Sequence, residues 1–166
     1  MPAFEQFVAA RGEALLRFAL MLCGDLHRAE DLVQSVLAKA YVRWSRVAAM
    51  ERPEAYLKAV LVSEHLRWWR RRSSGEVPVA GPAFADRPVD GDATAAHASR
   101  EAAWQLLRRL PRRQRAVLVL RYYEDLSDAQ IGEVLGCAPS TVRSQASRAL
   151  ATLRAALPAM DKEALP

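Results

Sequence analysis

The residues between Ser127 and Arg148 could form hydrogen bonds with the edges of DNA bases. Ser127 and Gln130 have the spacing of a capping box, which predicts the start of a short helix. Gly136 then allows a sharp turn, and Pro139 fits the first turn of a second helix. This pattern predicts a helix-turn-helix, whose second helix enters the DNA major groove. The outward positions of that helix are Ser140, Thr141, Arg143, Ser144, Gln145 and Arg148. Their donors and acceptors favour DNA binding over a helical hairpin with an ordinary solvated face.

A second group of residues combines aromatic rings with cations in the stretch LRWWRRR, residues 66–72. Arginine binds phosphate and tryptophan stacks on an unpaired base, so this stretch could bind partly melted nucleic acid. A solvated helix end explains the arginines equally well, because cations favour a helix C-terminus. A membrane-surface helix is disfavoured by Glu51, Glu54 and Glu64, which lie in the same helix and its entry.

The two tryptophans of this stretch are predicted to have different roles. Trp68 stands 11 residues after Leu57 and seven after Leu61, so helical phase assigns it to the core. Trp69 would then face nucleic acid.

Catalytic or metal-binding chemistry is not indicated. Cys23 and His27 have the spacing i, i+4, but a third and a fourth metal ligand are missing. There is no glycine-rich phosphate loop and no nucleophile elbow. We therefore predict a protein that is not an enzyme and has no metal or other cofactor.

Composition and charge agree with a protein that binds nucleic acid in the cytoplasm. The 166 residues carry a net charge of +5, and lysine occurs only at 39, 58 and 162, so arginine supplies nearly all of the positive charge. Two cysteines in apolar surroundings suit a reducing compartment. No signal peptide and no apolar run of ~20 residues is apparent, so we predict a cytoplasmic location without membrane insertion.

The chain is predicted to be all-α, with two small helical domains joined by a flexible acidic linker. The linker, 73–99, has one basic residue against four acidic ones and is rich in Gly, Pro, Ala and Asp. The first domain, 1–72, has expected helices that begin near Phe4, after an Asp25 N-cap, and at Pro53, with a loop at 46–52. The second domain, 100–166, has expected helices at about 99–109, 112–123, 128–135 and 139–156.

These pieces, taken in order, resemble the extracytoplasmic-function sigma factors of bacterial RNA polymerase. The resemblance spans about residues 4–156. It rests on LCGDLHRAEDLVQ and PEAYLKAVLVSEHLRWWRRR in the first domain and on LLRRLPRRQRAVLVLRYYEDLSDAQIGEVLGCAPSTVRSQASRAL in the second. It implies a protein that directs core RNA polymerase to promoters, in which the first domain corresponds to region 2 and the second to region 4. The implied partners are core RNA polymerase and promoter DNA, with an anti-sigma factor as a candidate regulator.

The resemblance also assigns roles to residues. The DLVQ helix would dock on the polymerase through Asp31, Leu32 and Gln34. Without the resemblance, the polar flank formed by Glu30, Asp31 and Gln34 fits an ordinary solvated helix face. The loop at 46–53 and the helix after it would read and open the −10 region through Arg46, Arg52, Arg67, Trp69, Arg70, Arg71 and Arg72. The helix-turn-helix would read the −35 region, with Arg112, Arg113 and Arg115 near backbone phosphates. The acidic linker would thread toward the polymerase active centre.

Several positions depart from the family pattern. Ser35 replaces an acid that commonly follows DLVQ, and Ser63 and Glu64 stand where asparagine is usual. Ala138 and Gln145 replace a common serine and a common basic residue, so no promoter sequence is carried over. The rival functions are a dimeric helix-turn-helix repressor or activator and a nucleic-acid enzyme. The first lacks a dimerisation element, and the second lacks a catalytic or metal site.

Overall fold

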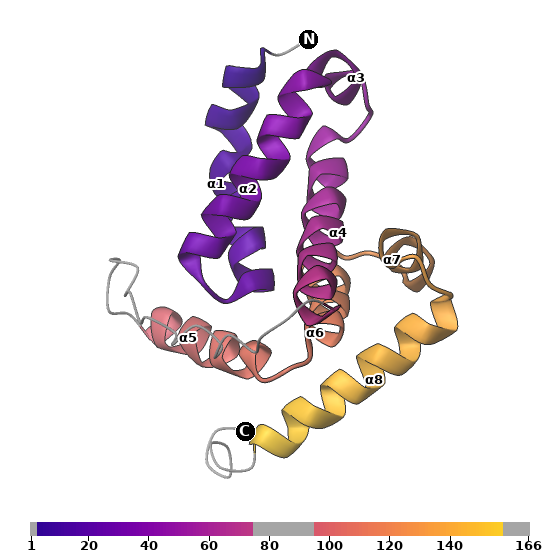
Figure 1. Ribbon diagram of the computed structural model, residues 1–166. Helices are drawn as coiled ribbons and strands as arrows, with labels where there is room; N and C mark the ends of the chain where they lie inside the picture. The colour runs from indigo at the N-terminus through magenta and orange to yellow at the C-terminus, as the bar shows by residue number, and fades with distance from the viewer. Residues whose placement is uncertain (1–2, 75–94, 158–166) are drawn as a thin grey trace. The chain divides into compact units, whose positions relative to one another are not determined.

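The computed structural model describes residues 3–74 and 95–157, with side chains described for 3–74 and 101–157 (Figure 1). Every regular element in these residues is helical, which confirms the predicted all-α fold. The chain divides into two compact units, residues 1–87 and 88–166, and each is described by itself. The elements of the first unit are α1 (Phe4–Cys23), α2 (Leu26–Val42), α3 (Trp44–Ala48) and α4 (Pro53–Ser74). Those of the second are α5 (Ala95–Arg108), α6 (Arg112–Leu118), the π-helical segment η1 (Val119–Tyr123), α7 (Asp128–Leu135) and α8 (Pro139–Ala156).

The predicted linker at 73–99 overlaps helices at both of its ends. Helix α4 continues to Ser74, and α5 begins at Ala95. The residues between these two helices, where the acidic and proline-rich sequence lies, are outside the described residues.

Helices α1, α2 and α4 lie side by side and form the core of the first unit (Figure 1). Local sequence determines where they begin and end. Gly24 adopts a left-handed conformation, with φ of 68°, and ends α1. Asp25 then caps α2, because its Oδ1 accepts a hydrogen bond from the Arg28 backbone N–H at 2.9 Å. The interior is filled by large apolar side chains from all three helices, namely Leu15, Phe18, Leu22, Val36, Leu57, Leu61 and Val62.

The segment 46–52 is not the uninterrupted loop that the sequence predicted. Helix α3 occupies its first residues, with the Val47 backbone N–H donating to the carbonyl of Arg43 at 3.1 Å. Val47 is buried in the first unit. Its packing stabilises this short helix, which lies against α2 and α4 and would be marginal alone.

In the second unit, α8 packs on α6 and α7. The expected helix at 112–123 consists of α6 followed by η1, in which the N–H of Glu124 reaches back to the carbonyl of Val119 at 3.3 Å. Ala146 and Ala149 are almost fully buried on α8. Small residues at these positions let the helix approach its neighbours closely and fix which of its faces remains in solvent.

Candidate nucleic-acid and protein interfaces

The turn between α7 and α8 has the local geometry that the sequence predicted. Ser127 Oγ accepts a hydrogen bond from the Gln130 backbone N–H at 3.2 Å. Gln130 Oε1 accepts in return from the Ser127 backbone N–H at 2.9 Å, so the capping box is confirmed. Gly136 has φ of 66°, in the left-handed region that favours glycine, and α7 ends there.

Gly132 is a second essential glycine of this turn, and the sequence analysis did not identify it. A Cβ atom at Gly132 would lie 2.5 Å from the carbonyl oxygen of Cys137. The Gly132 carbonyl accepts a hydrogen bond from the Cys137 backbone N–H at 2.9 Å. The close approach of α7 to the start of α8 therefore requires a residue without a side chain. Its position four residues before the turn glycine is the signal that sequence could have offered.

Helix α8 presents a polar face to solvent. Its buried side is formed by Val142, Ala146 and Ala149. The predicted base-reading residues lie on the other side: Ser140, Thr141, Arg143, Ser144 and Arg148 are exposed, and Gln145 is half-buried. Near the N-terminal end of α8 this face has the hydroxyls of Ser140 and Thr141, which can donate to and accept from base edges, and the guanidinium of Arg143, which can donate to them.

The three arginines at the start of α6 do not share one role. Arg112 is exposed, and partial desolvation lowers its pKa, although a guanidinium remains charged at neutral pH. Arg113 is half-buried, and its Nη2 donates to the carbonyl of Leu135 at 3.1 Å. This hydrogen bond joins α6 to the end of α7, and the half-buried Arg113 is still partly accessible to solvent.

The prediction that Arg115 lies near backbone phosphates is wrong. Its side chain is only 9% exposed and donates to three main-chain carbonyls, those of Leu107 at 2.8 Å, Arg108 at 3.0 Å and Leu110 at 3.3 Å. The last carbonyls of a helix have no partner within the helix. Arg115 provides donors for those at the end of α5, which makes it a structural residue.

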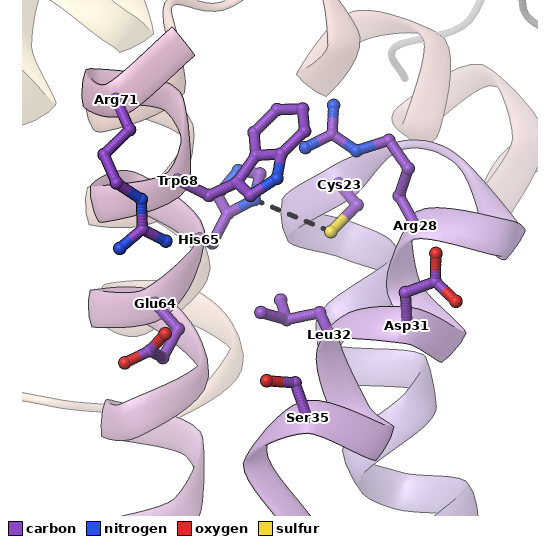
Figure 2. A pocket seen from close by; sticks show the side chains of 9 residues that line it. All are labelled: Cys23, Arg28, Asp31, Leu32, Ser35, Glu64, His65, Trp68 and Arg71. Atoms are coloured by element: carbon purple, nitrogen blue, oxygen red, sulfur yellow. Dashed lines mark hydrogen bonds between the residues drawn. The ribbon is translucent and has the colours of Figure 1, made fainter.

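In the first unit an open cleft of about 270 Å³ lies between α2 and the C-terminal half of α4 (Figure 2). Asp31, Leu32 and Ser35 line it from α2. Trp68 and Arg71 line it from α4 (Figure 2). The residues predicted to dock on a protein partner therefore adjoin those predicted to bind nucleic acid. Gln34 is exposed on α2 and is not among the residues that line the cleft.

The two tryptophans do not divide into one core residue and one exposed residue as predicted. Both are half-buried, and their rings meet edge to face with centroids 4.6 Å apart. The Arg28 guanidinium lies 3.8 Å from the Trp68 ring centroid and 4.3 Å from that of Trp69. Arg72 adds a second cation, 4.6 Å from the Trp68 ring. The assignment failed because Arg28, from α2, partly covers both rings, which helical phase within α4 cannot reveal.

Glu64 lies in the same cleft and organises the charges around it. Its carboxylate binds Lys39 at 2.9 Å and Arg67 at 3.3 Å. The hydrogen bond from Lys39 is the largest cause that holds the pKa of Glu64 below its ordinary value of 4.5. Arg67, predicted to meet the −10 region, thus has an acidic neighbour within its own helix. The other predicted −10 arginines, Arg46, Arg52, Arg70, Arg71 and Arg72, are exposed.

Cys23 and His27, whose spacing resembled half of a metal site, have different neighbours. Cys23 Sγ lies 3.6 Å from Nδ1 of the buried His65, whereas His27 lies 3.9 Å from Glu30. Within 3–74 and the described part of the second unit, no three His, Cys, Asp or Glu residues are grouped as metal ligands would be. None of the helices described there has the length and apolar character needed to cross a membrane.

Comparisons with known proteins cover both units. The family model described as Sigma-70 region 2 matches residues 7–75, and the one described as Sigma-70, region 4 matches residues 100–153. The RNA polymerase sigma-E factor of Streptomyces coelicolor is 40% identical over 97% of this chain and 89% of its own length. The ECF RNA polymerase sigma factor ShbA of Streptomyces griseus is 36% identical over 81% of this chain and 74% of its own.

A solved structure shares the fold. The sigma factor RpoE from Bartonella quintana, in complex with the anti-sigma factor NepR, matches with a TM-score of 0.70 at 24% identity. The match covers 95% of this chain and 98% of that one.

Proposed function

Because this chain belongs to the extracytoplasmic-function sigma factors of bacterial RNA polymerase, which direct promoter recognition and transcription initiation, we propose how its two units divide that work. Residues 1–72 bind core polymerase and the −10 region, and residues 100–166 bind the −35 region. The protein acts in the cytoplasm as a specificity subunit and not as an enzyme.

The observation that carries the proposal is the cleft of the first unit. Asp31 and Leu32 line one wall, and Trp68 and Arg71 line the other. A partner helix bound along α2 would lie directly beside the cationic end of α4. Exposed arginines at 70–72 can hold the phosphates of a strand that separates there, since phosphate contacts position nucleic acid without reading its sequence. Polymerase binding and promoter melting are thus performed at adjoining surfaces.

The exposed face of α8 supports the −35 role. Arg143 and Gln145 read base edges, and Arg112 holds a backbone phosphate. Loss of a base contact costs ~1–3 kcal/mol at one promoter position, whereas loss of a phosphate contact weakens all sequences alike and lowers the salt slope by about one unit. Sigma factor RpoE of Bartonella quintana binds an anti-sigma factor, and we propose a partner of that class for this chain as well.

The test is binding to core polymerase by the double variant Asp31→Ala/Gln34→Ala. Both side chains are exposed, so the variant should keep its helical circular dichroism spectrum while losing core affinity. Glu13→Ala, which removes an exposed acid from α1, is the matched control and should bind core as the unaltered protein does. Tight sequence-specific binding to duplex DNA by the protein alone, without affinity for core, would refute the proposal and favour an ordinary helix-turn-helix regulator.

A further inference from the structure

An acidic residue, Asp128, lies between two arginines of the second unit. It is the first residue of α7, and its Oδ1 is paired with Nη2 of Arg121 from η1. Its other oxygen, Oδ2, lies 4.0 Å from Nη1 of Arg143 on α8. One carboxylate thus joins the segment before the helix-turn-helix to an exposed residue of its second helix.

The two arginines differ in how firmly they are held. The side chain of Arg121 is 25% exposed and that of Asp128 is 22% exposed, so their close pair is largely shielded from water. Arg143 is 66% exposed and reaches outward from α8. Asp128 is therefore held by Arg121, and its carboxylate attracts the exposed guanidinium of Arg143. An arginine side chain loses rotamer entropy when it is immobilised on a base, and an attraction that restricts it beforehand reduces that cost.

We propose that Asp128 is a positioning residue for Arg143 and thereby determines specificity at one base pair of the −35 region. This inference rests on the proposed role of α8. With Nη1 directed toward Asp128, the Nε and Nη2 edge of the guanidinium remains to donate to the two acceptors of guanine, O6 and N7. The carboxylate also opposes a contact between Arg143 and backbone phosphate, because it would lie near that negative charge. The recognised base is therefore a guanine.

An acid at the start of α7 also has a purely structural explanation, since it interacts favourably with the helix dipole. The two roles differ in what they change. A structural role affects stability and weakens all promoters alike, whereas a positioning role affects discrimination at the one position that Arg143 contacts.

The experiment measures the binding of holoenzyme, reconstituted with the full-length chain, to a library of −35 sequences. Arg143→Ala first identifies the base pair that Arg143 reads. Asp128→Asn should then reduce discrimination at that base pair by about three- to tenfold, which is part of the ~5- to 150-fold that a bidentate contact provides. Preferences at the other positions should not change. Adding Asp128→Asn to Arg143→Ala should change discrimination no further, because the effect of Asp128 passes through Arg143.

Asp125→Asn is the matched control. Asp125 is an exposed acid in the preceding turn, and its φ of 53° is one that asparagine adopts readily, so its replacement should leave discrimination unchanged. Asp128→Ser provides a second variant that can still accept a hydrogen bond, in case Asp128→Asn does not fold.

The inference is overturned if both variants fold and weaken all sequences equally, or if the effects of Asp128→Asn and Arg143→Ala add. If Arg143→Ala alters no position, the base-reading role proposed for α8 fails too. A position-specific effect of Arg143→Ala with a silent Asp128→Asn refutes the positioning role alone.

Discussion

Replacing Arg115 by alanine should destabilise the second unit without directly removing a DNA contact. The guanidinium donates to three carbonyls at the end of α5 and just beyond it, at 2.8, 3.0 and 3.3 Å. Each such hydrogen bond contributes about 1 kcal/mol net, and water replaces it poorly where the side chain is buried. The expected loss is therefore about 3–4 kcal/mol, a large part of the ~5–15 kcal/mol that stabilises a typical domain.

The assay is urea unfolding of the full-length chain, followed by hydrogen-exchange mass spectrometry. Peptides from α6 and α8 report on the second unit separately from the first. Arg115→Lys should recover less than half of the loss, because a single ammonium group cannot reach three carbonyls as the guanidinium fork does.

Arg112→Ala is the matched control for this prediction. It removes an exposed arginine from the same helix and should cost clearly less stability than Arg115→Ala, whose side chain is buried. It should instead weaken DNA binding and lower its salt slope. If Arg115→Ala protein unfolds as the unaltered chain does and shows that DNA defect, then Arg115 contacts phosphate and the structural interpretation is refuted.

Three further predictions concern a glycine in close contact with backbone, the stacked tryptophans and the ion pair of Glu64. Gly132→Ala should cost ~1–3 kcal/mol, because its Cβ would overlap a backbone carbonyl; unfolding in urea measures this, and an unchanged midpoint would contradict the close approach. Trp68→Ala and Trp69→Ala should each destabilise the first unit by ~1–3 kcal/mol, less than for fully buried tryptophans, and a thermally neutral variant of either would show that its ring is not part of the stack. The hydrogen-bonded ion pair with Lys39 lowers the pKa of Glu64. The ion pair therefore stabilises the fold fully above pH 4.5, the ordinary pKa of a glutamate, and this stabilisation disappears as the pH falls through the lowered pKa of Glu64. Glu64→Gln should therefore flatten the loss of stability between neutral pH and acid in pH-dependent melts, and a pH profile identical to that of the unaltered chain would contradict this.

Sequence was sufficient wherever the relevant interaction is local. Asp25 and Ser127 were identified as N-caps because a cap bonds to backbone only two or three residues away. Gly136 was identified as the turn because left-handed backbone favours glycine regardless of what surrounds it. The outward face of α8 followed from its own apolar periodicity, with Val142 buried as expected. The family resemblance was equally accessible, since it rests on the order of such local motifs. The roles of individual residues in binding polymerase and promoter remain predictions.

Tertiary structure alone decided which residues of one chemical type serve the fold and which remain available to a partner. Arg112 and Arg115 stand three positions apart in one basic run, yet Arg112 is exposed whereas Arg115 is buried and donates to carbonyls at the end of α5. Arg28 covers the two tryptophans, and His65 pairs with Cys23, across about 40 residues of chain. The physical reason is that an arginine, a tryptophan or a cysteine has no fixed role of its own. Its role depends on the donors, acceptors and rings that helix packing brings within about 4 Å, and residues distant in sequence supply these.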